Sequence, residues 1–175
     1  QVNNNLTNLY IASTRLHSEL DRARVVSIIK EVAINFVGAE KFALLIHDES
    51  NSSLDFESGE GFEDEGFPKL TIENGLWKEV VCEGESFYRD GNVVEGSDDP
   101  LAPIAAIPLK IEDRCMGVLA IYHLFVQKER FEQVDYQLFS MLAEHAAIAL
   151  FSSSLYGASE RKRETYKGLM DLLLK

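Results

Sequence analysis

The stretch AAIPLKIEDRCMGVLAIYHL, residues 105–124, contains two apolar runs separated by a short charged break. Neighbouring strands with so short a connection pair antiparallel, so we predict a hairpin with strands at 104–111 and 115–124. Alternate positions in both runs are largely apolar, which indicates that other elements cover each face of the hairpin. The stretch therefore predicts an α+β domain built around a central antiparallel sheet.

The segments before this hairpin supply the covering elements. Apolar residues at helical spacing predict one helix before Asp21 and a second helix, capped by Asp21, that stops at Gly38. Two short strands joined by a polar turn follow within 41–62, and the apolar residues of 73–84 group on one face of a short helix. A brief strand at 86–89 precedes a loop rich in glycine, aspartate and proline. We therefore expect the sheet to lie between a helical layer and a layer of loops with one short helix.

The last segment predicts a long helix from Phe131 to the end, because it contains no proline. Its positions at three-four spacing are Ile148, Phe151, Leu155, Ala158, Lys162, Thr165, Leu169 and Leu172. The stretch 159–167 is too charged for a globular core, so we expect this helix to pair with its own copy in a homodimer. The alternative is a helix that folds back onto its own domain.

This pattern predicts three parts: an N-terminal helix at 1–24, a folded domain at 25–152 and a coiled-coil-like extension at 153–175. We predict that both ends of the chain contribute to the dimer. The predicted interface residues are Leu6, Leu9, Leu16, Ile148, Phe151, Leu155, Leu169 and Leu172.

The net charge of −12 is concentrated in one segment. Residues 48–99 contain sixteen Asp and Glu but three Lys and Arg, so the remainder of the chain is close to neutral. Such a surface repels phosphate backbones, and we expect no nucleic-acid binding. It also disfavours a highly anionic small ligand, unless a local cationic pocket exists. An acidic, solvated rim that keeps the protein soluble is the simplest interpretation.

No apolar run approaches the roughly 20 residues that cross a bilayer, so we predict no membrane contact. The chain begins without methionine and lacks the basic and apolar segments of a signal peptide. We therefore expect a cytoplasmic protein or a fragment of one. The cysteines Cys82 and Cys115 form no Cys-x-x-Cys pair, and no two histidines are three or four residues apart, so no metal site is predicted.

Residues 103–124, followed by 131–150, resemble the closing half of a GAF domain. Residues 16–49 resemble its opening helices and first strand, so the resemblance covers about 10–152. The matching motifs are Pro108-Leu109, Gly117-Val118-Leu119, Phe131 with Asp135, and Ala146-Ala147-Ile148-Ala149. The resemblance implies a sheet of about six strands with terminal helices on one face and a ligand pocket over the other. A PAS-like sensor, which has similar layers, is the alternative fold.

The resemblance also implies a bacterial regulatory domain that binds a small molecule or a partner and relays the change through its terminal helices to a signalling or transcriptional effector. The pocket would be lined by Phe56, Phe62, Trp77, Val81, Phe87, Tyr88, Ile104, Ala106 and Tyr122. Alternatives are a ligand-free dimerisation or interaction module, in which aromatic rings fill the pocket, and a cysteine-based redox domain. The sequence identifies no cofactor.

Specialised branches of the family fit less well. Cyclic-nucleotide binders have a Glu where this chain has Tyr136 and an Asn-Lys pair that is missing from 123–130. Bilin binders attach the chromophore to a Cys followed by His, which neither cysteine here provides. Free methionine sulfoxide reductases need a cysteine in the loop before the Pro-Leu strand, and 91–103 has none. We therefore expect no enzyme activity and assign no catalytic residue.

Overall fold

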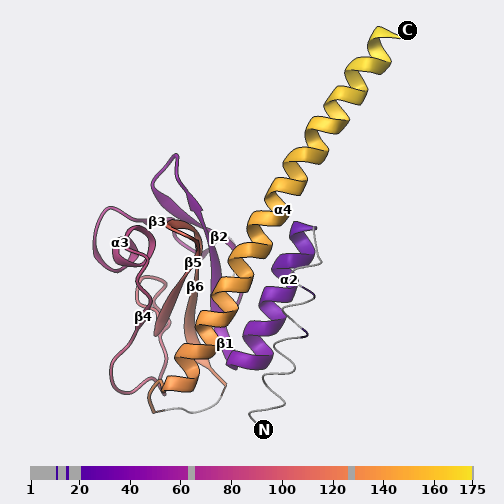
Figure 1. Cartoon of the computed structure of the whole chain (residues 1–175). Coiled ribbons are helices and arrows are strands. Elements are labelled where there is room, and N and C mark those ends of the chain that lie inside the picture. The colour runs from indigo at the N-terminus through magenta and orange to yellow at the C-terminus, as the bar shows by residue number, and fades with distance from the viewer. Residues whose placement is uncertain (1–10, 12–14, 16–20, 63–65, 126–128, 175) are drawn as a thin grey trace.

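The computed structural model describes residues 11, 15, 21–62, 66–125 and 129–174, and of 156–160 the backbone only. The predicted first helix and its residues Leu6, Leu9 and Leu16 lie outside the described residues. Six strands form one antiparallel sheet in the order β3-β2-β1-β6-β5-β4 (Figure 1). They are β1 (Ala39–Asp48), β2 (Ser53–Glu60), β3 (Leu70–Thr71), β4 (Phe87–Tyr88), β5 (Ala105–Ile111) and β6 (Arg114–Leu124). This architecture confirms the predicted α+β fold.

The hairpin of β5 and β6 lies next to β1, near the middle of the sheet. Its turn is shorter than predicted: Arg114 pairs with Ile111, so only Glu112 and Asp113 connect the strands. Glu112 has a φ of 54°, in the left-handed region that tight turns often need. On the other side of β6, Gly117 lies against β1, where a Cβ atom would be 2.2 Å from the carbonyl oxygen of Leu45. The Gly-Val-Leu motif therefore permits close packing of the two central strands.

Two helices cover one face of the sheet. They are α2 (Arg22–Val32), which continues into the π-helix η1 (Ala33–Val37), and α4 (Gln133–Leu173). Asp21 caps α2 by accepting a hydrogen bond from the Ala23 amide at 3.0 Å, and Gly38 ends η1 in the left-handed conformation, as predicted. α2 packs against α4 and α4 against β5, as Figure 1 shows. Their contact with the sheet forms the larger core.

The beginning of α4 is fixed by a capping box and a buried aromatic ring. The Asp135 carboxylate accepts from the Glu132 amide at 2.8 Å, while the Glu132 side chain accepts from the backbone of Asp135. Phe131 is buried in the helix-covered core. Asp135 thus orders the start of α4, and Phe131 anchors it in the larger core.

The opposite face is covered by α3 (Gly75–Cys82) and by loops. Trp77, Val80 and Val81 of α3 are buried against the sheet, and Leu76 is partly buried beside them. The predicted short helix is therefore confirmed. Its buried residues and the facing residues of the sheet form the second, smaller core of the domain.

One described segment, Gln133–Leu155 of α4, is long and apolar enough to cross a membrane by length and composition alone. Its buried residues face β5 and α2, including Phe139, Leu142, Ala146 and Leu150. The apolar character of this segment thus belongs to a partly buried core helix.

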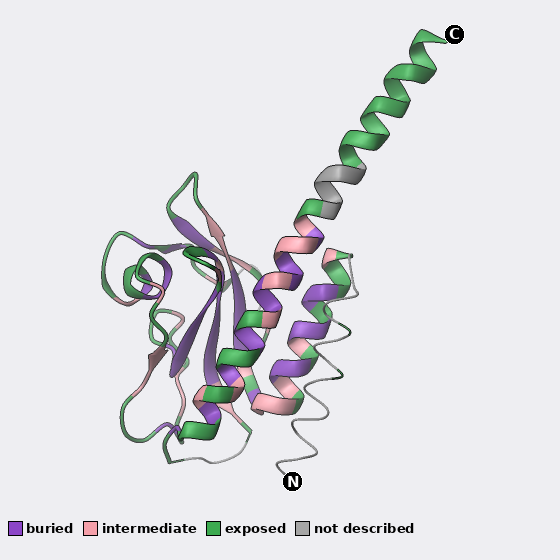
Figure 2. Ribbon diagram, viewed as in Figure 1, coloured by how far each residue is buried: buried purple, intermediate pink, exposed green. Residues whose placement is uncertain are grey.

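The second half of α4 continues past the body of the domain. At 1.5 Å per residue, its 41 residues span about 60 Å. Residues 161–174 are all exposed, as Figure 2 shows, so the helix does not fold back onto its own domain. Among these residues, Leu169 is 54% and Leu172 74% exposed.

Candidate functional site

Aromatic rings cluster on the loop-covered face of the sheet. Phe62 packs edge-on against Tyr122 of β6 and against Phe67, with ring centroids 4.8 and 5.1 Å apart. Phe56 of β2 lies 5.2 Å from Phe67. Tyr122 is completely buried beneath these rings. Any ligand that reaches Tyr122 must therefore displace a ring or a loop.

A lysine, a histidine and a carboxylate meet at the edge of this aromatic cluster. Lys41 of β1 and His123 of β6 are partners in the strand pairing, and both contact Asp98. The distances to Asp98 Oδ1 are 3.2 Å from Lys41 Nζ and 2.9 Å from His123 Nε2. Because a carboxylate only accepts hydrogen bonds, the imidazole donates from Nε2. His123 and then Lys41 hold the pKa of Asp98 below its usual value.

Lys41 also connects this charged group to the aromatic cluster. Its Nζ lies 4.5 Å from the centroid of Phe62, a cation–π contact. The chain passes close to the Lys41 stem at Gly61, where φ is +80° and a Cβ atom would be 2.7 Å from Lys41 Cγ. One lysine thus contacts both the segment that follows β2 and the loop that carries Asp98.

The loop between β4 and β5 (residues 89–104, the β4–β5 loop) is attached to the end of β6 by hydrogen bonds to backbone carbonyls and by close packing. The Ser97 amide donates to the Tyr122 carbonyl at 2.8 Å, and the Tyr122 hydroxyl donates to the Pro100 carbonyl at 2.7 Å. Gly96 has a φ of +62°, and a Cβ atom there would lie 2.4 Å from His123 Nδ1. Glycine is therefore required for this close approach.

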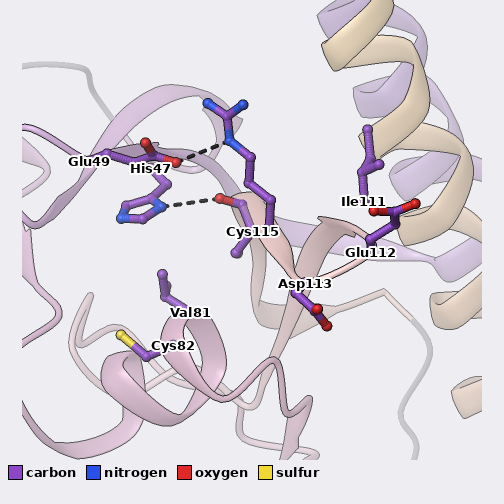
Figure 3. Close-up of a pocket in the computed structure, with 9 residues that line it drawn as sticks. His47, Glu49, Val81, Cys82, Ile111, Glu112, Asp113 and Cys115 are labelled. Atoms are coloured by element: carbon purple, nitrogen blue, oxygen red, sulfur yellow. Dashed lines mark hydrogen bonds and ion pairs between the residues drawn. The ribbon is translucent and has the colours of Figure 1, made fainter.

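A separate cleft of about 460 Å³ lies between α3 and the turn of the β5–β6 hairpin (Figure 3). His47 Nδ1 contacts the Cys115 carbonyl at 3.1 Å, and Arg114 forms an ion pair with Glu49 at 3.1 Å. Cys82 also lines this cleft. Within the described part of the chain, no group of three His, Cys, Asp or Glu residues is placed to hold a metal ion.

A family model described as the GAF domain matches residues 19–150, three quarters of the chain. The chain belongs to the GAF domain family. The match spans the capped helix α2, all six strands and the buried half of α4. No curated protein matches the sequence.

Solved structures show the same fold at low identity. The GAF domain of a phosphoenolpyruvate-protein phosphotransferase from Coxiella burnetii has a TM-score of 0.69 and 18% identity, over 89% of this chain and 97% of that one. The GAF domain of the potassium sensor histidine kinase KdpD from Escherichia coli has a TM-score of 0.59 and 14% identity, over 88% and 98%. Free methionine-R-sulfoxide reductase from Neisseria meningitidis, in complex with its substrate, has a TM-score of 0.62 and 17% identity, over 85% and 89%.

This GAF domain places most of the predicted pocket residues on the loop-covered face. They belong to the smaller core or pack against it: Phe56, Phe62, Trp77, Val81, Phe87, Ala106 and Tyr122. Trp77, Val81, Ala106 and Tyr122 are buried within it, whereas the three phenylalanines are partly exposed. Their role in ligand binding stays a prediction.

The predicted positions of Tyr88 and Ile104 were wrong. Both pack into the helix-covered core, and Tyr88 contacts Phe131, Tyr136 and Phe139 of the α4 region. Successive residues of a strand point to opposite faces, so Phe87 and Tyr88 cannot both face one pocket. Burial raises the pKa of the Tyr88 hydroxyl to about 12, with the neighbouring Tyr136 contributing.

The two cysteines of the GAF domain lie in the same cleft but differ in environment. Cys115 is buried and its thiol donates to the Gly117 carbonyl at 3.1 Å, whereas Cys82 is exposed. Burial raises the pKa of the Cys115 thiol, although nearby backbone groups and Lys110 oppose this shift. A thiol reacts as the thiolate, so the environment of Cys115 makes it less reactive than an ordinary cysteine.

Sequence reasoning missed the group of Lys41, Asp98 and His123. These residues are separated by 57 and 25 positions, and only the pairing of β1 with β6 brings the lysine and the histidine together. The sequence did indicate that an anionic ligand would need a local cationic pocket, but no spacing revealed it. Knowledge of the strand order would have been required.

Proposed function

We propose that this GAF domain is a sensory or regulatory domain that relays a change on its loop-covered face through α4. The observation that carries this proposal is the continuity of α4. Its first half packs against β5, while its second half is exposed and carries apolar residues at heptad spacing. A helix with this arrangement can transmit a displacement of the sheet to whatever pairs with its exposed end.

The partner that we propose for the exposed end is a second copy of the chain. Leu155, Leu169 and Leu172 are 54–74% exposed, while Ile148 and Phe151 of the same stripe are partly buried on the domain. Exposed leucines at heptad spacing are expected to be covered by an identical helix in a dimer. Lys162 and Thr165 interrupt the stripe, so we expect a weak, adjustable pairing in its middle.

Measurement of the mass of the full chain in solution tests the dimer. We expect twice the chain mass of 19.7 kDa. The double substitution Leu169→Asp and Leu172→Asp should yield the monomer, because it places charges in the apolar stripe. Lys167→Asp, at an exposed position outside the stripe, is the matched control and should leave the dimer intact. A monomeric wild-type chain at high concentration would contradict the proposal.

The relay is tested by the distance between spin labels at position 166 of the two protomers, measured by pulsed electron paramagnetic resonance. Gly96→Ala, which disturbs the β4–β5 loop, should shift the distance distribution if α4 transmits the change. An identical distribution in a stable dimer would leave a ligand-free dimerisation module as the better description.

A redox role is the second candidate, since Cys82 and Cys115 line one cleft. Oxidation of the two thiols by hydrogen peroxide would form one disulfide and two waters. Intact-mass measurement after peroxide treatment should show a loss of two hydrogens if this occurs. A double substitution of both cysteines by Ser that preserves every response of the domain would exclude it.

A further inference from the structure

We propose that Lys41 and His123 form a recognition site for the carboxylate of a small ligand, and that Asp98 occupies this site as an internal competitor. This inference rests on the proposed sensory function and names the class of ligand that the loop-covered face would take. It begins from the convergence of two hydrogen-bond donors, Lys41 Nζ and His123 Nε2, on one carboxylate oxygen.

The two donors are fixed to the sheet, whereas the acceptor is supplied by a loop. The side chains of Lys41 and His123 are 19% and 26% exposed and come from paired positions of neighbouring strands. The Asp98 side chain is 84% exposed, so it contributes almost nothing to packing. The two donors therefore form a preorganised site, and a ligand carboxylate can replace the Asp98 carboxylate within it.

The geometry of the bonds also favours exchange. Both donors contact the same atom, Asp98 Oδ1. A carboxylate on a separate ligand has two oxygens and can offer one to each donor, as paired charge-assisted bonds prefer. A ligand can thus satisfy the site at least as well as Asp98 does.

The loop remains in place without Asp98 because other contacts attach it. Ser97 donates to the Tyr122 carbonyl, Tyr122 donates to Pro100, and Gly96 packs against His123. These contacts also keep Asp98 close to the two donors, at the high effective concentration of a tethered group. Asp98 should therefore reduce the apparent affinity for an external carboxylate.

The surroundings restrict the rest of the ligand. Lys41 lies over Phe62, which packs against Tyr122, so an apolar or aromatic group next to the carboxylate would contact these rings. The excess of acidic residues in 48–99 opposes ligands with several negative charges. The class that fits is a small monocarboxylate with an aromatic or branched apolar group.

Phenylacetate and its neutral analogue phenylacetamide are suitable probes. Titrations of the labelled full chain, followed by nuclear magnetic resonance, give the dissociation constant and locate the shifted residues. We expect Asp98→Ala to bind phenylacetate on the order of tenfold more tightly than the wild type, because the competitor is removed. Asp98→Asn provides a second variant with the original side-chain shape, should the alanine variant alter the loop.

Three controls identify the site. Asp90→Ala, at an exposed position of the same loop, removes the same charge and should bind like the wild type. Lys41→Gln in the Asp98→Ala background should abolish the gain. Phenylacetamide should bind no more tightly to Asp98→Ala than to the wild type. Shifts should centre on Lys41, Tyr122 and His123.

Equal phenylacetate binding by wild type, Asp98→Ala and Asp98→Asn would overturn the proposal. An equal gain for phenylacetamide, or shifts centred on another region, would overturn it as well. These results are independent of the mass and distance measurements on α4. The domain would then remain a dimeric relay without this ligand class, whereas failure of the α4 tests alone would leave the carboxylate site standing.

Discussion

The two faces of the sheet are closed by different means. On one face, α2 and α4 bury a continuous layer of aliphatic and aromatic side chains, of which Ile29, Leu109, Ala146 and Leu150 are at most 1% exposed. On the other face, a short helix and several loops cover a smaller core and are attached through individual hydrogen bonds and ion pairs. Figure 2 shows buried residues recurring along α2 and the first half of α4, with exposed residues between them, whereas the loops on the other face are mostly exposed or intermediate.

This difference suggests a division of roles. A buried side chain of the helical layer contributes several kilocalories per mole, whereas a single hydrogen bond contributes about 1 kcal/mol. Local opening therefore costs less on the loop-covered face. That face can respond to a ligand while the helical layer, and α4 with it, stays folded and transmits the response.

The strongest test of this difference is truncation of Phe139 in the helical layer. Phe139 is 2% exposed and lies 6.0 Å from Phe131 and 5.8 Å from Tyr88, measured between ring centroids. Phe139→Ala should lower the free energy of unfolding by about 3–5 kcal/mol, because it leaves a cavity in the larger core. Urea denaturation measures this loss.

Met141→Ala, on the exposed side of the same helix, is the matched control. It should change the free energy of unfolding by less than about 0.5 kcal/mol. Equal effects of the two substitutions would show that α4 does not depend on its buried face.

A smaller and more local effect is expected from Gly96→Ala in the β4–β5 loop. Gly96 has a positive φ, and a Cβ atom would lie 2.4 Å from His123 Nδ1 and 2.5 Å from the Tyr122 carbonyl oxygen. We expect a cost of about 1–3 kcal/mol, with increased local opening only in the loop, while the sheet and α4 move as folded units. Hydrogen exchange should accelerate at Ser97 and Ala102, whose amides bond in this region, and not in β5 or β6.

Gly91→Ala separates backbone strain from the steric clash. Gly91 also has a positive φ, but among the described residues, apart from its two chain neighbours, no atom lies within 4 Å of its Cβ position. If it reproduced the full effect of Gly96→Ala, the close approach to His123 would not be what holds the loop.

The sequence predicted the helix-covered layer better than the loop-covered one, for a physical reason. Asp21, Gly38 and Asp135 act through neighbours along the chain, and helical spacing directly identifies a buried face. The hairpin of 105–124 was likewise predictable, because its strands are adjacent in sequence.

The candidate site depended on contacts that are distant in sequence. The group of Lys41, Asp98 and His123 exists only because β1 pairs with β6 and the β4–β5 loop crosses the end of both. Tyr88 was placed on the wrong face because the two-residue strand β4 has no pattern long enough to fix its alternation. Ile104 was misplaced because it precedes β5, where strand alternation does not apply. Positions in loops and short strands were therefore the least predictable.

The smallest of these expected effects is the loss of the Asp98 contacts with Lys41 and His123 at low pH. His123 and Lys41 lower the pKa of Asp98 in the folded state relative to about 3.9 in an unfolded chain. Because this pKa is depressed, the contacts of ionised Asp98 stabilise the attached β4–β5 loop above about pH 4. Their contribution is lost as the pH falls through the pKa of Asp98 in the folded state. Because Asp98 is largely exposed, solvent screening keeps the effect on global unfolding small.

A titration of the Asp98 carboxyl resonance tests this prediction. Its midpoint should lie below 3.9, and His123→Gln should raise that midpoint because His123 is the larger cause of the lowered pKa. A wild-type midpoint at or above 3.9 would show that Lys41 and His123 do not hold Asp98 in solution, and that the loop is attached by its other contacts alone.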